Sequence, residues 1–323
     1  TYSLEAGQTL GIVGESGSGK SVSAMSIIKL LDGNGYIESG EITFNGRDIL
    51  KATDKDMYHI RGNEISVIFQ EPMTSLNPVF TVERQIGEVL QIHQKLSKKE
   101  ARAKVASLLA DVKIPNPERI LKTYPFALSG GMRQRAMIAM AMITRPKLLI
   151  CDEPTTALDV TIQAKILELI RSIQKERGIS VIYITHDLGV VAKVADYVDV
   201  MYAGKIVETG TIDEIFYDPK HPYTWGLLSA MPDLDTADDR LYTIPGSPPN
   251  LLHEKPGDAF APRNRFALNI DDEIDPPMFK ISDTHYAATW LLDPRAPKVE
   301  MPPELKERIA RMKAEAKKIE EAE

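Results

Sequence analysis

Eight consecutive residues near the start of the chain, GESGSGKS, have a composition and spacing suited to phosphate binding. They are Gly14, Glu15, Ser16, Gly17, Ser18, Gly19, Lys20 and Ser21. The glycines let the backbone curl so that its N–H groups face phosphate oxygens. Lys20 can then reach the β- and γ-phosphates of a nucleotide, and Ser21 can offer its hydroxyl to Mg²⁺. A chance glycine-rich turn is the alternative, but a strand-like run, LGIV, precedes the loop and a helical run, VSAMSIIKLL, follows it, as a phosphate loop requires.

Further polar residues stand at the ends of apolar runs that resemble buried strands. Asp152 and Glu153 end KLLICDEP, Gln70 follows ISVIF, and His186 follows VIYIT. At this edge of an open α/β sheet, Asp152 is suited to hold Mg²⁺ and Glu153 to orient and deprotonate an attacking water. We expect Gln70 to touch the metal or the water and His186 to contact the γ-phosphate. Solvated loop residues and strand-capping roles are the alternatives.

A second glycine-rich stretch, LSGGMRQRAM at 128–137, has no lysine among its glycines. Ser129 is a good helix N-cap, and the free N–H groups of a helix that starts with Gly130 and Gly131 form an anion site. One nucleotide needs a single lysine-bearing loop, so this second site suggests a nucleotide sandwiched between two such domains. A plain capped helix, with glycines for close packing, is the alternative.

The elements that position these residues follow an α/β pattern. Four apolar runs, LGIV, ISVIF, KLLIC and VIYIT, alternate with helical patterns, which predicts a mostly parallel sheet covered by helices. Residues 71–145 show almost no strand signal and predict a helical subdomain. Pro and Gly become dense after about residue 212. We therefore expect a phosphate-binding domain at 1–212 and a loop-rich module at 213–323 that ends in a helix.

Length and composition exclude several classes of protein. The 323 residues, 43% hydrophobic and with a net charge of −7, predict a soluble chain with one large and one small domain. The apolar runs are far shorter than the roughly 20 residues that cross a bilayer, and no secretory signal is visible, so we expect a cytoplasmic protein. The single cysteine, Cys151, excludes an internal disulfide. The acidic balance argues weakly against a large nucleic-acid footprint.

Together, the motifs resemble those of an ABC transporter ATP-binding subunit. GESGSGKS, Gln70, LSGGM, LLICDEP, TALD at 156–159 and His186 occur in that family's order and approximate spacing. The resemblance implies an ABC-type P-loop NTPase core with a helical subdomain and a small loop-rich C-terminal module. It also implies that the chain binds ATP and Mg²⁺ and hydrolyses ATP.

In that family two such domains pair head to tail. The resemblance then implies that Ser129, Gly130 and Gly131 hold the γ-phosphate of ATP bound mainly by the partner. Asp159 would connect the two sites across the dimer. On the ATP of this chain's own loop, the catalytic residues would be Glu153, His186 and Gln70, and the Mg²⁺ residues Ser21, Gln70 and Asp152.

Finer features resemble one of the two ATPases of bacterial oligopeptide and dipeptide importers. They are LSGGMRQR, FQEPMTSLNPVFTV, HPYTWGLLSAMP and IPGSPPNLLHEKPGDAFAPR. The resemblance implies a heterodimer with a second ABC ATPase subunit, two membrane-spanning permease subunits and, indirectly, an extracellular substrate-binding protein. The chain would lie peripherally at the cytoplasmic face of the bacterial membrane, with no nucleic-acid partner. The alternatives are a nickel or glutathione importer ATPase and, more distantly, a soluble ABC ATPase acting on nucleic acid or ribosomes.

Two departures from the family pattern stand out. Many members bind an iron–sulfur cluster through C-terminal cysteines, whereas the matching positions here are Asp258, Asn264, Asp271 and Thr289. We expect no cluster on these residues. Packing around residues such as Phe260, Phe266 and Trp290 would hold the module instead, and a hard-metal site at Asp258 and Asp271 is an alternative. Members also usually begin earlier and carry an aromatic residue that stacks on adenine. We expect that this chain begins too late to contain it, and Tyr2 is not assigned the role.

Overall fold

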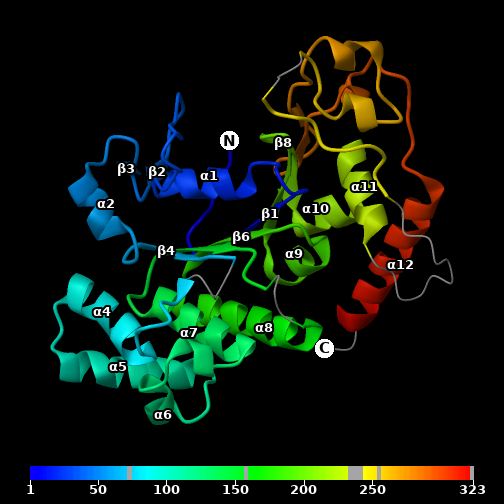
Figure 1. Cartoon of the computed structure of the whole chain (residues 1–323). Coiled ribbons are helices and arrows are strands. Elements are labelled where there is room, and N and C mark those ends of the chain that lie inside the picture. The colour runs from blue at the N-terminus through cyan, green and yellow to red at the C-terminus, as the bar shows by residue number, and fades with distance from the viewer. Residues whose placement is uncertain (71–74, 156–158, 232–242, 253–255, 321–323) are drawn as a thin grey trace. The chain divides into compact units, whose positions relative to one another are not determined.

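The computed structural model describes residues 1–70, 75–155, 159–231, 243–252 and 256–320 (Figure 1). The chain divides into two compact units. Unit 1 consists of Thr1–Ser3, Leu10–Lys20 and Thr185–Glu323, and unit 2 consists of Leu4–Thr9 and Ser21–Ile184. The boundary passes through the phosphate loop between Lys20 and Ser21, so the chain itself links the two units there.

Unit 2 contains three parallel strands. β5 (Leu148–Asp152) pairs with β4 (Ile65–Ile68) on one side and with β6 (Ser180–Thr185) on the other. β5 is buried along its whole length, which explains its unbroken apolar run, because strands covered on both faces do not alternate with polar residues. Cys151 is fully buried in β5, and this burial raises the pKa of its thiol. The side chain therefore serves as a small apolar group.

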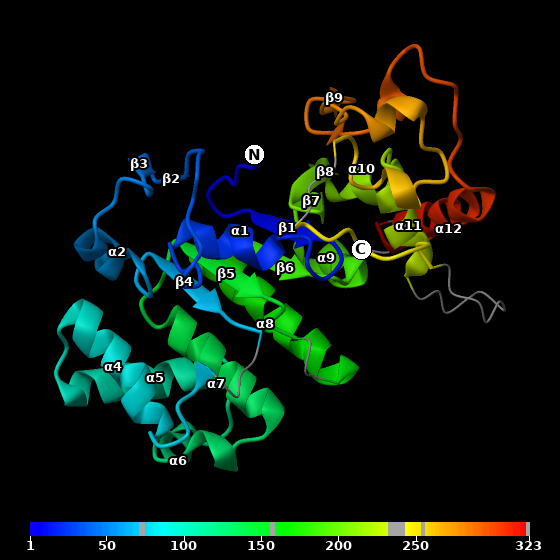
Figure 2. The ribbon, with the colours of Figure 1, turned by 45° about the horizontal axis from the view of Figure 1, so that its top comes forward.

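Helices make up most of the rest of unit 2. They are α1 (Lys20–Ile27), α2 (Asp54–Ile60), α4 (Val82–Gln94), α5 (Lys98–Asp111), α6 (Pro117–Leu121), α7 (Gly130–Met142) and α8 (Val160–Arg177). A short hairpin, β2 (Thr43–Phe44) with β3 (Arg47–Asp48), precedes α2. From residue 75 to residue 145 the described chain contains no strand, and α4 to α7 pack against one another (Figure 2). This is the helical subdomain that the sequence predicts.

Unit 1 contains a mixed sheet. β1 (Thr9–Val13) pairs in parallel with β7 (Tyr197–Tyr202), and β7 pairs antiparallel with β8 (Lys205–Thr211). The sheet continues through β10 (Tyr286–Ala287) to β9 (Phe279–Lys280), both antiparallel. The described part of the unit includes the helices α9 (Leu188–Val194), α10 (Ile212–Tyr217), α11 (Pro222–Ala230) and α12 (Pro303–Glu320). It also includes the 3₁₀ turns η2 (Ala261–Arg263), η3 (Asn269–Asp272) and η4 (Trp290–Leu292), and a further such turn, η1 (Pro125–Ala127), lies in unit 2.

One hydrophobic core joins β7 and β8 to the chain beyond residue 212. The rings of Tyr202 and Tyr223 have centroids 4.7 Å apart, and that of Phe260 lies 5.2 Å from Tyr202. Leu305 and Ile309 bring α12 into the same core. The loop-rich residues from 256 to 302 are thus held by apolar packing.

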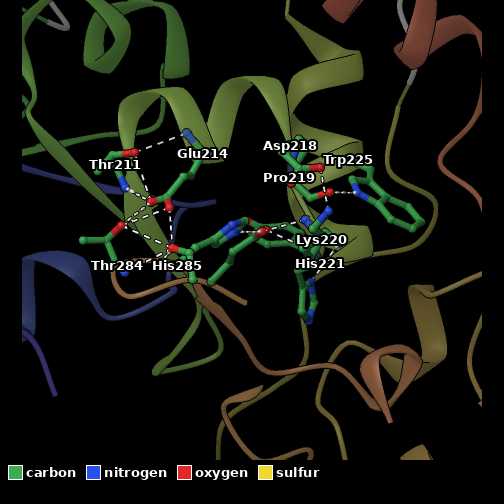
Figure 3. Close-up of polar contacts among 12 residues, drawn as sticks. Thr211, Glu214, Asp218, Pro219, Lys220, His221, Trp225, Thr284 and His285 are labelled. Carbon is green, nitrogen blue, oxygen red and sulfur yellow. Dashed lines mark hydrogen bonds and ion pairs between the residues drawn. The ribbon is translucent and has the colours of Figure 1, made fainter. Parts of the chain in front are cut away.

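A buried polar network strengthens the same attachment (Figure 3). Glu208 on β8 is fully buried and accepts hydrogen bonds from the backbone N–H groups of Lys220 (2.6 Å) and His221 (3.1 Å). Its carboxylate also lies 2.8 Å from Nε2 of His285. Trp225 donates its indole N–H to the carbonyl of Pro219 at 2.8 Å. Because this carboxylate has partners from two other segments, the start of α11 and the β9–β10 region are fixed to β8.

A second buried carboxylate, Asp199 on β7, is poorly paired. Its Oδ1 accepts a hydrogen bond from Thr209 at 2.6 Å, but Oδ2 is buried with no hydrogen-bond partner in the described part of the chain. Burial raises the pKa of Asp199 from 3.8 to about 6. Since the folded pKa is above the unfolded value, this group favours folding fully below pH 3.8, and the contribution is lost as the pH rises through 6.

We predict that Asp199→Asn reduces this pH dependence, because the amide keeps an oxygen for Thr209 and cannot ionise. The free energy of unfolding of the variant, relative to that of the native chain, should grow by about 1 kcal/mol between pH 5 and pH 7.5. Urea denaturation at the two pH values measures this, with Asp283→Asn as a control because the side chain of Asp283 is 97% exposed. An identical pH dependence in Asp199→Asn and the native chain would contradict the prediction.

Candidate functional site

The loop from Gly14 to Ser21 has the backbone conformation that its glycines predict. Gly17 and Gly19 have φ values of 79° and 95°, which L side chains rarely adopt. Gly14, directly after β1, lies so close to β7 that a Cβ atom would be 2.1 Å from the carbonyl oxygen of Met201. The N–H of Ser18 turns back to the carbonyl of Glu15 at 3.2 Å. The loop therefore forms a tight turn directly after β1.

Lys20 folds back over this loop. Its side chain is 5% exposed, and Nζ donates hydrogen bonds to the carbonyls of Gly14 (2.7 Å) and Glu15 (2.9 Å). The hydroxyl of Ser18 is buried and has no hydrogen-bond partner among the described residues. A buried ammonium and a buried hydroxyl with no partner among the described residues are chemically suited to phosphate oxygens.

The loop also has partners that the sequence did not reveal. The backbone N–H of Glu15 donates to the hydroxyl of Tyr223 at 2.8 Å, and the carboxylate of Glu15 pairs with Arg263. Tyr223 and Arg263 lie 208 and 248 residues away from Glu15 in the chain. No local motif reports contacts over such a separation, so these contacts could not be predicted from the sequence.

In unit 2 the structure brings together Ser21 and Asp152. Ser21, the last residue of the loop, belongs to unit 2 and is exposed, whereas Asp152, the last residue of β5, is 8% exposed. The Ser21 hydroxyl donates a hydrogen bond of 2.9 Å to Oδ1 of Asp152. A hydroxyl and a carboxylate at this spacing form an oxygen donor pair that fits Mg²⁺, which prefers hard oxygen ligands and keeps several waters.

Glu153 and Gln70 form a second pair in unit 2. Nε2 of Gln70 donates to Oε2 of Glu153 at 3.1 Å. Glu153 has φ 45°, an uncommon value for a non-glycine residue, and its N–H donates to the carbonyl of Ile184 at 3.0 Å. The left-handed backbone conformation of Glu153 ends the extended course of β5, so the Glu153 side chain does not continue the alternation of the strand. Strain of this kind concentrates at functional sites.

The lysine-free glycine stretch begins α7, as predicted. Ser129 is the N-cap, and its hydroxyl accepts from the N–H of Met132 at 3.3 Å. Ser129 and Gly130 are exposed, and a Cβ at Gly131 would lie 3.1 Å from the side chain of Ile162. Gly130 therefore lies open at the helix start and Gly131 allows close packing against α8, whereas the role of this helix start in binding an anion stays a prediction.

Helix α7 is also tied to the carboxylate loop. Gln134 is completely buried, and its Nε2 donates to the carbonyl of Pro154, the residue after Glu153, at 2.5 Å. The glycine-rich helix start and the end of β5 are thus connected inside unit 2. The sequence did not single out Gln134, because it stands between Arg133 and Arg135 in a polar turn of the helix.

The remaining predicted positions lie at the ends of other elements. Asp159 is the N-cap of α8, and its Oδ1 accepts from the N–H of Ile162 at 3.0 Å. The other three residues of TALD, 156–158, lie outside the described residues, as do 71–74 after Gln70. His186 is exposed and directly follows β6, in unit 1.

The C-terminal positions that match cluster-binding cysteines do not fit an iron–sulfur cluster. Each of the four oxygen-bearing side chains accepts a hydrogen bond from a nearby backbone N–H: Asp258 from Phe260, Asn264 from Phe266, Asp271 from Leu268 and Thr289 from Leu291. Within the described residues, no group of three or more His, Cys, Asp or Glu could hold a metal ion. Carboxylate, amide and hydroxyl groups in this arrangement stabilise turns.

Comparisons with known proteins identify the family. A family profile described as "ABC transporter" matches residues 1–156, and one described as "Oligopeptide/dipeptide transporter, C-terminal region" matches residues 207–270. The oligopeptide transport ATP-binding protein OppD of Bacillus subtilis is 57% identical over 96% of this chain and 87% of its own length. The chain belongs to the ABC transporter family. The dipeptide transport ATP-binding protein DppD of Lactococcus lactis is 55% identical over 93% of this chain and 86% of its own length.

Solved structures of ABC cassettes are similar to this chain as well. The post-hydrolysis dimer of the ATP-binding cassette MJ0796, bound to ADP and Pi, has a TM-score of 0.58 at 26% identity over 65% of this chain and 88% of its own. The cbiO1 protein of Clostridium perfringens has a TM-score of 0.59 at 29% identity over 67% of this chain and 82% of its own. The resemblance and the fold class expected from the sequence are confirmed. In the described part of the chain, no helix is both long enough and apolar enough to span a bilayer.

Proposed function

We propose that the chain is the ATPase subunit that powers import of oligopeptides or dipeptides through membrane-spanning partners. The observation that carries the proposal is the glycine-rich loop with buried Lys20, followed at once by Ser21 in contact with Asp152. Such a loop and carboxylate are the shared parts of enzymes that bind ATP and transfer its terminal phosphoryl group. The relatives named as oligopeptide and dipeptide transport proteins support the cargo.

Binding of ATP would rest on the loop. Backbone N–H groups from Gly14 to Lys20 would face the phosphates, and the Lys20 ammonium would turn from the loop carbonyls toward the β- and γ-phosphates. Ser21 and Asp152 would hold Mg²⁺, with Gln70 close to it through its contact with Glu153. When bound, the ion would neutralise charge on the phosphate oxygens.

Hydrolysis would depend on Glu153. Its carboxylate is held by Gln70 and set by the left-handed backbone turn after β5, so it can orient a water and accept its proton. His186, exposed after β6, would donate a hydrogen bond to the γ-phosphate. The chain thus contributes positioning and electrostatic stabilisation, and forms no covalent intermediate.

The start of α7 would act on a second subunit's nucleotide. Ser129, Gly130 and Gly131 offer a hydroxyl and helix N-terminal N–H groups without a lysine, which suits a γ-phosphate that another subunit already binds. Asp159, at the N-cap of α8, would connect the two sites. The partners would be a second ABC ATPase, two permease subunits and, indirectly, an extracellular binding protein, with this chain peripheral at the cytoplasmic face of the membrane.

The competing functions differ in cargo or in class. A nickel or glutathione importer would use the same ATP chemistry, and a soluble ABC ATPase would act on nucleic acid or ribosomes. The peptide importer is favoured by the match of residues 207–270 to the C-terminal region of oligopeptide and dipeptide transporters. Residues 207–270 lie outside the ATP-binding motifs, so their match indicates which group of transporters the chain resembles and says nothing about ATP binding.

We predict that Glu153→Gln keeps ATP binding but lowers the steady-state ATPase activity of the assembled transporter about 100-fold or more, because the amide cannot accept a proton. Cells with this variant should also lose uptake of labelled di- and oligopeptides and keep uptake of nickel. The surface variant Glu300→Gln, whose side chain is 81% exposed, is the control. Lost nickel uptake with intact peptide uptake would replace the cargo, and unchanged ATPase activity would refute the role of Glu153.

We predict that Ser129→Arg leaves ATP binding by this chain unchanged and lowers ATP hydrolysis in the heterodimer by about tenfold or more, because the added side chain fills the place of the partner's γ-phosphate. Nucleotide titration of the chain alone and ATPase assays of the complex measure the two effects. Ser97→Arg is the matched control, since Ser97 also caps a helix, α5, but begins no glycine-rich sequence. Loss of ATP binding by the chain alone would show that α7 serves its own nucleotide.

A further inference from the structure

The side chain of Arg263, in the C-terminal module, contacts the phosphate loop directly. Arg263 is 7% exposed, and Nη1 and Nη2 lie 2.5 Å and 3.0 Å from Oε2 and Oε1 of Glu15. Nε donates to the carbonyl of Pro245 at 2.8 Å, and Nη1 also lies 3.2 Å from the hydroxyl of Tyr202. The guanidinium is therefore held in one orientation, with its planar fork matched to both oxygens of the carboxylate.

The backbone of Glu15 also forms hydrogen bonds to buried side chains. Its N–H donates to the hydroxyl of Tyr223, a residue with no exposed surface, at 2.8 Å. Its carbonyl accepts a hydrogen bond from Lys20 at 2.9 Å. Tyr223 is fixed in turn by ring contacts with Tyr202 and Phe260. A continuous set of contacts thus runs from the aromatic core of the C-terminal module to the lysine that would bind phosphate.

The charge on Glu15 gives these contacts an electrostatic consequence. A carboxylate in a loop that receives a nucleotide repels the phosphates, and this repulsion is strong where water is partly excluded. The Arg263 guanidinium cancels that charge and keeps the carboxylate turned toward the C-terminal module. The Glu15 carboxylate in turn raises the pKa of Arg263, so the arginine remains charged under all ordinary conditions.

We propose that Arg263 is a positioning residue of the ATP site, which acts through Glu15 to hold the phosphate loop open to nucleotide and to neutralise its one acidic side chain. The C-terminal module is then a working part of the nucleotide site. This inference rests on the proposed function, because it requires that the loop containing Lys20 binds ATP. It assigns to the region after residue 212 a role in ATP affinity rather than in the catalytic step.

The test is a set of variants of the full chain, titrated with a fluorescent ATP analogue and Mg²⁺. Arg263→Met should weaken binding by about tenfold, because it leaves the Glu15 carboxylate unpaired beside the phosphates. Adding Glu15→Gln to Arg263→Met should restore most of the affinity, since the repelling charge is then removed. Arg263→Lys, which keeps the charge but loses the fork, should fall between the native chain and Arg263→Met. In the assembled transporter, Arg263→Met should raise KM for ATP and leave kcat nearly unchanged.

Controls separate this role from a general loss of folding. Arg295→Gln removes an arginine whose side chain is 84% exposed and pairs with Asp293 at the surface, and it should bind ATP as the native chain does. Thermal unfolding without nucleotide identifies variants that fail to fold. If Arg263→Met fails to fold, Arg263→Lys takes its place in the test, and adding Glu15→Gln to Arg263→Lys should then restore ATP affinity.

Lys20→Ala distinguishes failure of this inference from failure of the proposed function. If Lys20→Ala binds ATP normally, the loop is not the nucleotide site, and both the proposed function of the loop and the positioning role of Arg263 are refuted. If Lys20→Ala loses binding while Arg263→Met binds like the native chain, only the positioning role is overturned. Equal weakening in Arg263→Met and in the Glu15→Gln double variant also overturns it, because the defect would then not come from the unpaired carboxylate.

Discussion

The tight turn of the loop from Gly14 to Ser21 around the buried ammonium of Lys20 is the constraint on which the rest of the structure depends. The loop needs positive φ at Gly17 and Gly19 and a close approach of Gly14 to β7, so it cannot be built from other residues. Lys20 is only 5% exposed, and the carbonyls of the loop itself accept hydrogen bonds from its side chain. Phosphate oxygens are the partners that best replace such internal contacts.

Around that site, the fold uses the two places where backbone geometry concentrates polar groups. The ends of parallel strands supply side chains, as Asp152 and Glu153 follow β5. The starts of helices supply N–H groups, as at Ser129 before α7 and Asp159 before α8. Gln134 links one of each kind, because it joins α7 to the carbonyl of Pro154. Chemistry that consists mainly of charge stabilisation needs little else from a protein.

Much of this arrangement could be predicted from the sequence, because it depends on short motifs and local periodicity. The four predicted strand cores correspond to β1, β4, β5 and β6, and the phosphate loop and the α7 N-cap follow from their own residues. The contacts of Glu15 with Arg263 and Tyr223, and of Glu208 with His285, could not be predicted. They join positions far apart in the chain, and each partner alone is an ordinary polar residue. The catalytic roles of Glu153 and His186 remain predictions.

The central claim is that ATP lies on the loop of this chain and is closed over by a second ATPase. A structure of the assembled transporter with ATP and Mg²⁺ bound, in the Glu153→Gln form, tests it most directly. The account predicts phosphates against the Gly14–Ser21 backbone, Mg²⁺ beside Ser21 and Asp152, and the γ-phosphate covered by the partner's glycine-rich helix start. A nucleotide bound away from Lys20, or bound by this chain with no second subunit over it, would contradict the account.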